Sequence, residues 1–452
     1  MVIFASLTLR YRRRVPSSVC ALGALACVLL LAEAARAQTP APSATVSQTT
    51  VIGPGDLIRR AFDANRDLAA ARLDLERGRS RLRQAGLRPN PTVDVEHTTG
   101  RLAGSPDERE IGVGLALPVE VGGRRQRRID MATAELAVIE AEIANREREL
   151  TRQILAAYVD AIAAIRELET TNRLHQLDEQ MAAVVRTRVE EQDAPPLELN
   201  LLLTEVARLR GRRALIQGRV DAALIAIGQL IGAPHDGLAL QPSSTSLDAV
   251  TIPNDLESAM TTALDRRADV TVARLSEAAA EAGVRLARAE AWPDLTVSAA
   301  YRTSRGISDL PSPLTAVPDT DHVVAFGASI GLPFFNKNQG ARAEADVALR
   351  QARLRREFTE HTVRAEVASA FRRAEAARTA LTIFERDVVP LANDNIRVIR
   401  AAYDLGEFRI TDVITEQRRL LEAQQEYTDA LAERYRAIVD LRAAMGLTGF
   451  QP

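Results

Sequence analysis

The sequence predicts a mainly α fold with a β-barrel part, built from a strand pair and a long helical hairpin that occur twice. Two strand ends show the duplication, because GVGLALPVEVGGRR at Gly112–Arg125 matches GASIGLPFFNKNQG at Gly327–Gly340. In this match Pro118 corresponds to Pro333. Each strand end leads into a helical pattern that is too long for an ordinary globular core. One structural unit has therefore been used twice in this chain.

Residues 1–37 have the pattern of a signal peptide. Several Arg residues precede the apolar run Val19–Leu31, and a small-x-small site predicts cleavage before Gln38. Both cysteines, Cys20 and Cys27, lie in the apolar run, so the mature chain has no disulfide and no thiolate ligand. Lipid attachment at Cys27 is an alternative that the sequence leaves open.

The composition argues against a nucleic-acid partner. Cleavage removes five Arg and one Glu, so the formal charge moves from −2 to about −6 in the mature chain. An acidic chain lacks the basic surface that phosphate backbones require. No mature segment has 18 consecutive apolar residues, and we expect no transmembrane helix. Strands are then the route by which this exported chain would enter a membrane.

The mature chain divides into a leader, two repeats and a linker. Residues 38–51 are small, polar and Pro-containing, which is typical of a flexible leader. Repeat one covers 52–240 and repeat two covers 255–452, with a linker at 241–254. The patterns predict first helices at Asp56 to about Ala85 and Asp255 to about Ala291; strands at about 91–100, 110–118, 293–303 and 321–333; long helices at about 123–192 and 340–403; and return helices at about 197–232 and 409–446.

The second strand of each repeat alternates between two kinds of residue. Bulky apolar residues alternate with Gly or Ala over Ile111–Leu117, and with Ala, Gly or Ser over Val324–Leu332. Strands of about 9 to 11 residues with this alternation suit a tilted strand that has one face on lipid and a small-residue face on a lumen. Four aromatic residues near strand ends fit either an aromatic girdle or ordinary packing: Trp292, Tyr301, Phe334 and Phe335.

The long helices carry a coiled-coil pattern. Arg124–Ala194 contains no Gly and no Pro, which predicts one helix of about 70 residues and roughly 100 Å. Apolar residues recur every seven positions, which indicates a seam against neighbouring helices. Pro390 is expected to kink the long helix of repeat two. The seam residues are Ile129, Leu136, Ile143 and Leu150.

Four strands cannot close a barrel. An open sheet edge in lipid leaves unpaired backbone groups that cost several kcal/mol each, so closure requires several chains. Three copies would give an even-numbered barrel of twelve strands with an open lumen.

The sequence lacks the motifs of enzymes and of metal sites. We find no H-E-x-x-H helix, nucleophile elbow, P-loop or dinucleotide fingerprint, and therefore predict no enzyme activity, no cofactor and no resident metal. The paired acids Glu190 and Glu191 fit a solvated helix face better than an acid/base pair. The five His residues are scattered: His97, His175, His235, His322 and His361.

Two segments at the strand–helix junctions resemble a known family. LPVEVGGRRQRR at Leu117–Arg128 is similar to the P-x-E-x-G-G-(K/R)-R segment of the CzcC-type subgroup of TolC-like outer-membrane efflux proteins. LPFFNKNQG at Leu332–Gly340 is similar to that subgroup's P-L-F-(N/D)-x-N-Q-G segment. The duplicated organisation resembles the family over essentially the whole mature chain. The junction residues in the two segments are Pro118, Gly122, Gly123, Pro333, Asn338, Gln339 and Gly340.

The resemblance implies a homotrimeric channel in the outer membrane of a Gram-negative bacterium. Its 12-stranded β-barrel would continue into a periplasmic α-helical barrel. The implied partners are outer-membrane lipid, a periplasmic adapter (membrane fusion) protein and an inner-membrane resistance-nodulation-division pump. The implied cargo is a divalent heavy-metal cation such as cobalt, zinc or cadmium, for which this chain would be a conduit.

The tip of the second hairpin also matches the family. Its pattern is a Tyr, a Gly three residues later, and then D-V-L, which Tyr403–Ile414 follows closely. By this resemblance Asp412 would project into the closed periplasmic mouth, where its ionisation would bias the mouth open. The family has a second acid three residues later, where this chain has Thr415 with Glu416 beside it. The other interpretation of Asp412 is an exposed acid in a first helical turn. The residues expected to dock on the adapter are Tyr403, Leu405, Gly406, Glu407 and, where the first tip lacks the Gly, Pro195 and Pro196.

Two other functions remain open at this point. A TolC-like duct for multidrug efflux or type I protein secretion would keep the channel and change the cargo. A periplasmic coiled-coil scaffold or adapter belongs to another class, and would carry one hairpin flanked by compact modules rather than a duplicated unit.

Overall fold

The computed structural model describes residues 51–100, 108–234, 239–240, 255–308 and 317–447. The predicted signal peptide with Cys20 and Cys27, nearly all of the leader, His235 and the linker 241–254 lie outside the described residues. The elements of the first repeat are β1 (Val51–Ile52), α2 (Pro54–Ala64), α3 (Arg66–Ala85), β2 (Thr92–Thr99), β3 (Arg109–Val119), α4 (Arg124–Glu190), α5 (Pro196–Ile231) and β4 (Ala239–Leu240). Those of the second are α7 (Leu256–Arg266), α8 (Ala268–Ala289), β5 (Leu295–Ser308), β6 (Val317–Ile330), α9 (Gln339–Ile383), η1 (Phe384–Val388), α10 (Val389–Asp404) and α11 (Ile410–Ala444).

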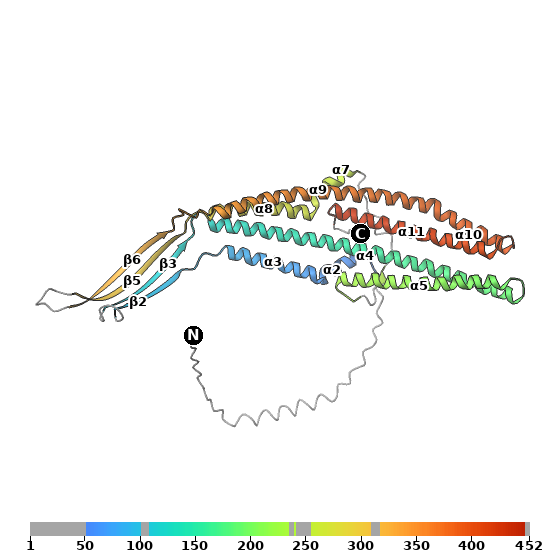
Figure 1. The fold of residues 1–452 in the computed structure, drawn as a ribbon, viewed down its shortest axis with the longest axis horizontal. Coiled ribbons are helices and arrows are strands. Elements are labelled where there is room, and N and C mark those ends of the chain that lie inside the picture. The colour runs from blue at the N-terminus through green and yellow to red at the C-terminus, as the bar shows by residue number, and fades with distance from the viewer. Residues whose placement is uncertain (1–50, 101–107, 235–238, 241–254, 309–316, 448–452) are drawn as a thin grey trace, which may run out of the picture. The chain divides into compact units, whose positions relative to one another are not determined.

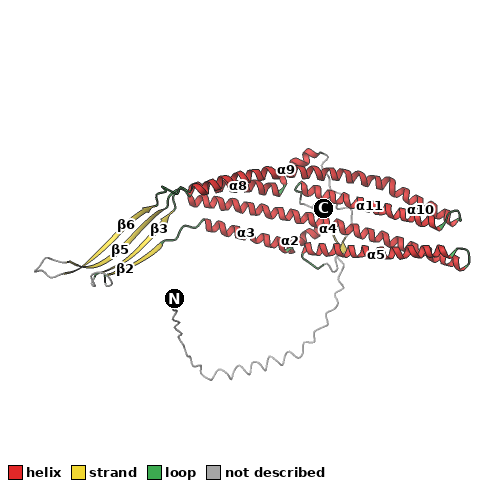
Figure 2. Cartoon of the chain, in the orientation of Figure 1, coloured by secondary structure: helices red, strands yellow, loops and turns green. Residues whose placement is uncertain are grey.

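Within residues 50–452, the four longer strands and the helices occupy separate regions, while β1 and β4 pair with each other in the helical region (Figures 1 and 2). Strands β2, β3, β5 and β6 lie together at one end of α4 and α9, and the tips of the two hairpins lie at the other end. Helix α4 packs against α5, α3, α8 and α11, and α9 packs against α8, α11 and α7. Each repeat therefore joins a strand pair to a helical hairpin, with the second repeat beside the first.

The four longer strands form one antiparallel sheet in the order β2-β3-β5-β6. Strands β3 and β5 are central, while β2 and β6 each have one paired side within the described residues. Strand β6 ends at Ile330, earlier than the predicted 333, and β5 continues to Ser308, beyond the predicted 303. Pro333 has no N–H to donate to a ladder, which agrees with the early end of β6.

Register gives the sheet one apolar face and one face of small and polar residues. On the first, Val113 lies opposite Val95 and Tyr301, and Tyr301 lies opposite Val324. The next rows toward the helices on this face are Val93, Leu115, Ala299 and Phe326, then Leu117, Val297 and Ala328. Rows on the other face are Asp94, Gly114, Ala300 and Ala325, and Glu96, Gly112, Arg302 and Val323. The exposed apolar face is the one that a lipid-facing surface requires.

The first helix predicted for each repeat is in fact two helices, so the prediction of single helices was wrong. The chain is extended at Asn65 between α2 and α3, and at Arg267 between α7 and α8. The Asn65 side chain accepts a hydrogen bond from the Leu68 amide and donates one to the Leu230 carbonyl at 2.9 Å. The Arg267 side chain donates to the Ala444 carbonyl at 3.3 Å. Each break therefore ties its repeat to the end of its own return helix.

A glycine in the left-handed conformation ends each return helix against the break. Gly232 has φ +65°, and a Cβ there would lie 2.6 Å from the Ala64 carbonyl oxygen. Gly446 has φ +74°, and a Cβ there would lie 2.9 Å from the Arg266 carbonyl carbon. Both positions require glycine for its conformation and for its lack of a side chain.

The predicted kink of the long second helix is a π-helical turn. Segment η1 (Phe384–Val388) separates α9 from α10, and Pro390 follows in the first turn of α10. Pro390 has no N–H for the carbonyl one turn earlier and its ring crowds that carbonyl, and a widened turn relieves both problems.

One described helix, α5, is long and apolar enough to cross a membrane by length and composition. We expected no such helix from the lack of an unbroken apolar run, and that criterion misses α5 because charged residues interrupt its sequence, although they are sparse in its C-terminal half. Two of those charges are used within the bundle, since Arg212 and Arg219 bind Glu167 of α4 at 3.3 and 2.6 Å. Packed helices of soluble domains meet the same compositional criterion, and these contacts make α5 the return limb of a hairpin.

We predict that Gly232→Ala lowers the free energy of unfolding by about 1 to 3 kcal/mol and therefore lowers the melting midpoint of the purified protein. The new Cβ would meet the Ala64 carbonyl and would hold a left-handed backbone. Gly218→Ala in the same helix is the matched control, because no atom lies within 4 Å of its Cβ position. Circular dichroism melting in detergent measures both variants. Equal melting midpoints would show that neither the Ala64 contact nor the left-handed backbone at position 232 requires glycine.

Candidate functional site

The strand–helix junctions use the same backbone conformation in both repeats. Gly123 precedes α4 with φ +73°, and Asn338 precedes α9 with φ +57°. Asn tolerates the left-handed region better than most residues, and here its Nδ2 also donates to the Ala287 carbonyl at 3.0 Å. Gln339 supports the same turn, since its Oε1 accepts from the Lys337 amide at 2.8 Å. Different residues therefore produce one geometry.

A glycine in the first junction leaves room for an aromatic ring. Gly122 has φ +70°, and a Cβ there would lie 2.6 Å from Cγ of Trp292. Arg124 donates to the Trp292 carbonyl and lies 2.6 Å from the Asp294 carboxylate. The first junction therefore binds the segment that leads into β5 of the second repeat. At the second junction, no atom lies within 4 Å of a Cβ built on Gly340.

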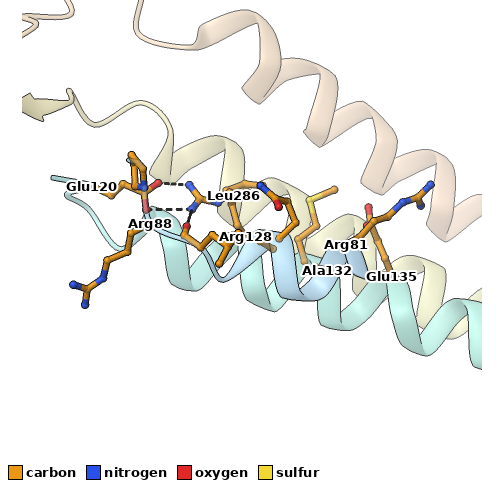
Figure 3. A pocket seen from close by; sticks show the side chains of 12 residues that line it. Arg81, Arg88, Glu120, Arg128, Ala132, Glu135 and Leu286 are labelled. Carbon is orange, nitrogen blue, oxygen red and sulfur yellow. Dashed lines mark hydrogen bonds and ion pairs between the residues drawn. The ribbon is translucent and has the colours of Figure 1, made fainter. Parts of the chain in front are cut away.

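An ion pair borders a hollow of about 550 Å³ beside this junction (Figure 3). Arg128 pairs with Glu120 and also donates to the Leu87 carbonyl at 3.2 Å. This pairing raises the pKa of Arg128 above its ordinary value. Figure 3 shows the paired side chains at one end of the hollow and Arg81 and Glu135 at the other. The polar residues of the signature segment thus hold the backbone between strand and helix.

The tips of the two hairpins have the same helix-end geometry. Gly406, with φ +77°, follows α10, and its amide donates to the Tyr403 carbonyl while the Glu407 amide donates to Ala402. At the first tip Gln192 has φ +62° and makes the equivalent bond to Val189. Gln192 therefore takes the place of Gly406, a position that sequence reasoning had assigned to Pro195 and Pro196.

Pro195 and Pro196 instead begin α5, as Arg409 and Ile410 begin α11. This gives two acids equivalent positions in the first helical turns. The Asp412 carboxylate accepts the Arg409 amide at 3.0 Å, which caps its own helix. Pro195 has no amide hydrogen, so Glu198 cannot cap in this way. Glu198 is left available for a partner elsewhere.

Tyr403 joins the two hairpins through that free acid. Its hydroxyl donates to Glu198 at 3.4 Å, and Arg188 donates to the same hydroxyl at 3.5 Å. The Arg188 guanidinium also lies 5.8 Å from the Tyr403 ring centroid and 3.0 Å from Asp193. Burial and the neighbouring Glu198 carboxylate raise the pKa of Tyr403 above its ordinary value. Sequence reasoning found Tyr403 but missed Arg188 and Glu198, whose role depends on the pairing of hairpins.

The three predicted gate residues do not share one environment. Asp412 is half-buried, whereas Thr415 is exposed and its hydroxyl donates to the Thr411 carbonyl at 2.8 Å. Glu416 is buried within the chain and pairs with Arg419 at 3.1 Å. Of the three predicted gate residues, Asp412 and Thr415 therefore have their polar groups near the surface of a single chain, and Glu416 does not.

Apolar side chains are exposed at both tips. Leu405 is 77% exposed and Phe408 is 45% exposed at the second tip, and Leu197 is 65% exposed at the first. Large apolar side chains exposed together at the end of a bundle are available for a contact with another protein. Pro195, Pro196, Gly406 and Glu407 are exposed beside them.

Buried polar side chains of α4, α5 and α11 lie within the helical bundle, away from the tips. Asp178 of α4 is 3% exposed, and its Oδ1 has no hydrogen-bond partner among the described residues. Burial, and then the Glu205 carboxylate of α5, raise the pKa of Asp178 to about 6, against the opposing effects of Gln417 and Arg400. Glu205 is buried too and pairs with Arg208 at 3.1 Å and with Arg418 of α11 at 2.7 Å. An acid of raised pKa therefore sits where the first hairpin meets the second.

We predict that Asp178→Asn stabilises the protein more at pH 7.5 than at pH 5. The pKa of Asp178 is higher in the folded chain, so its stabilising proton is fully present below about pH 4 and is lost as the pH rises through about 6. The gain at pH 7.5 should be about 1 to 3 kcal/mol and should fade toward pH 4. His175 and Glu179 on the same helix remain in both proteins and cancel in the comparison.

Melting midpoints at the three pH values measure this effect, with the exposed Asp63→Asn as the control. A stability difference between wild type and Asp178→Asn that is the same at pH 4, 5 and 7.5 would contradict it.

Comparisons with known proteins agree with this geometry. The family model of the outer membrane efflux proteins matches residues 57–233 and 259–447. The cobalt-zinc-cadmium resistance protein CzcC of Cupriavidus metallidurans is 23% identical over 404 residues, which cover 85% of this chain and 88% of CzcC. The pyoverdine export outer membrane protein OpmQ of Pseudomonas aeruginosa is 28% identical over 351 residues, 75% of this chain and 70% of OpmQ.

A crystal structure of CusC has the same fold. It superposes with a TM-score of 0.72 at 22% identity, and the match covers 87% of this chain and 92% of CusC. The predicted fold class is thereby confirmed. The match of the family model to both repeats excludes the alternative of a single-hairpin adapter. The chain belongs to the family of outer membrane efflux proteins.

Proposed function

We propose that three copies of this chain form the outer-membrane exit duct of a tripartite efflux system, and that its cargo is a divalent heavy-metal cation. Strands β2 and β6 each have an edge with no partner among the described residues. These edges support the trimer, because closure pairs them and three four-stranded sheets give twelve strands. Apolar side chains left exposed along the helices supply the surface for neighbouring copies: Leu177, Val184, Leu203, Leu215, Val347, Leu354, Phe358 and Val398.

The acidic inner face of the sheet is the observation that carries the cargo proposal. Opposite the apolar face, the sheet bears Asp94, Glu96, Glu110 and Asp321, and Arg302 is the one base in these described rows. In a closed barrel this face lines the lumen. Acidic rings concentrate cations and oppose anions, so the lumen favours a divalent metal over an anionic organic cargo.

Relatives support two cargo classes. CzcC is by name a cobalt, zinc and cadmium resistance protein, which agrees with a metal. OpmQ exports pyoverdine and has the higher identity over a shorter match, which supports a duct for organic compounds as the second candidate. A duct for type I protein secretion is the remaining alternative, and the acidic inner face gives no preference for it.

Within the described residues no group of three or more His, Cys, Asp or Glu side chains could hold a metal ion. Cargo would therefore pass by attraction to dispersed carboxylates, and the pump and adapter would select the metal. We propose that the hairpin tips dock on a periplasmic adapter through Leu405, Phe408 and Leu197, with a resistance-nodulation-division pump in the inner membrane. Asp412 is the gate acid that we retain, because Glu416 is buried on its own chain.

Deletion of this chain should sensitise its host to divalent metals. We expect a lower tolerance of zinc, cobalt or cadmium, with unchanged tolerance of dyes and antibiotics, and rescue by the wild-type chain. Sensitivity to organic compounds alone would keep the duct and reject the metal cargo.

Neutralising the inner acids should reduce cation selectivity in planar bilayers. The double variant Asp94→Asn/Glu96→Gln should shift the reversal potential in a salt gradient toward zero, since fewer lumen charges attract cations. Glu76→Gln, an exposed acid on α3, is the control and should leave the potential unchanged. A reversal potential that is the same in the double variant and wild type would remove the inner face from cargo selection.

Leu405→Glu should abolish efflux while trimers still form in the outer membrane. A charge at this exposed tip disrupts an apolar contact with the adapter but touches little of its own chain. Leu405→Met keeps the apolar surface and should retain efflux. Crosslinking to the adapter in cells checks the contact, and normal efflux by Leu405→Glu would place docking elsewhere.

A further inference from the structure

On the side away from the helices, the last row of the apolar face that crosses all four strands is basic, and β5 and β6 continue beyond it with Ile307 opposite Pro318. Thr99, Arg109, Arg305 and Thr320 lie opposite one another across all four strands. The next row toward the helices is His97, Ile111, Thr303 and His322, and the rows beyond it are mostly apolar. Over the rows that cross all four strands, this order from charged through polar to apolar is that of a surface crossing from a membrane interface into hydrocarbon.

Arg109 and Arg305 form a pair of like charges. They are directly opposed in the register, and both are exposed. Within the described part of the chain no ion pair reaches either guanidinium, whereas Arg302 on the other face lies 3.9 Å from Glu110. Like charges directly opposite each other destabilise a sheet, so an anion bound between the two guanidinium groups would stabilise this one.

The pair lies on β3 and β5, the two central strands. Neighbouring copies would join at the edges, β2 and β6, so a strand of another copy would not cover Arg109 or Arg305. On the outward face of a closed barrel the remaining neighbour is the membrane. A charged group of a lipid would then be the anion that lies against this pair.

A hydrogen-bonded aromatic pair, Tyr301 and His322, lies next to the basic row on the same face of the sheet. The Tyr301 hydroxyl lies 2.7 Å from Nδ1 of His322, and the two rings are stacked 6.0 Å apart with 15° between their planes. With the hydroxyl as donor, the proton of the neutral imidazole is on Nε2, which becomes a further donor on this face. His322 lies two residues from Thr320, the partner of Arg305.

We propose that Arg109 and Arg305, with His322 beside them, bind a phosphate group of the outer-leaflet glycolipid. Two guanidinium forks match the oxygen atoms of one phosphate, and the contact removes the repulsion between them. The bound lipid fixes the height of the barrel in the membrane. This inference rests on the proposed outer-membrane trimer and is independent of its cargo.

Native mass spectrometry of the purified trimer tests the site with three probes: bisphosphorylated lipid A, monophosphorylated lipid A and phosphatidylethanolamine. The wild type should retain bisphosphorylated lipid A most strongly, and Arg109→Gln/Arg305→Gln should retain it about tenfold more weakly. Arg302→Gln, on the same strand but the other face, is the matched control and should bind like the wild type.

Equal retention of lipid A by the double variant and the wild type would overturn the site. Displacement of the lipid by inorganic phosphate at equal concentration would also overturn it, because the pair would then be a general anion site. If the double variant does not form trimers, Arg109→Gln and Arg305→Gln are measured singly, and full retention by both contradicts the proposal. Failure of the wild type to form trimers would contradict the proposed duct instead.

Discussion

The two unpaired edges of the four-stranded sheet constrain the rest of the structure. Strands β2 and β6 each present a row of backbone donors and acceptors with no partner among the described residues. In hydrocarbon each unpaired group costs several kcal/mol, so the sheet is stable in a membrane only when other copies pair with both edges. The helices also keep apolar side chains exposed in a single chain, which agrees with the same requirement. In the proposed trimer, closing the barrel would bring those helices side by side and would bury the exposed apolar side chains.

Duplication has preserved backbone geometry while the residues that produce it have changed. A residue in the left-handed conformation precedes each long helix, Gly123 in the first repeat and Asn338 in the second. Another such residue follows that helix at the hairpin tip, Gln192 in the first repeat and Gly406 in the second. Where a residue change removes a hydrogen bond, the residues at equivalent positions of the two repeats have different roles. Arg409 offers an amide to Asp412, but Pro195 has none to offer Glu198. One acid consequently caps its own helix, and the other binds Tyr403 across the hairpins.

Periodicity and punctuation were enough to predict the duplicated strands and helical hairpins. They could not show the breaks at Asn65 and Arg267, because both positions lie inside continuous helical patterns and the break depends on a hydrogen bond to a distant helix end. They also placed Pro195 at the turn, where Gln192 in fact adopts the left-handed conformation. The burial of Asp178, Glu205 and Glu416 depends on which faces of four helices meet. Such contacts are set by tertiary packing and leave no local pattern.

The two signature segments report junction geometry more directly than cargo. Glu120 and Arg128 pair with each other, Gly122 leaves space for Trp292, and Asn338 holds the Ala287 carbonyl. Side chains so engaged in their own chain are poorly placed to contact cargo. A likeness at these positions is expected among ducts that share a junction, whatever they export. Among the described residues, the charges on the inner face of the sheet make one ion pair, between Arg302 and Glu110, so the other charges there would be free to interact with cargo. The nature of the cargo is therefore better inferred from that face than from the shape of the junction.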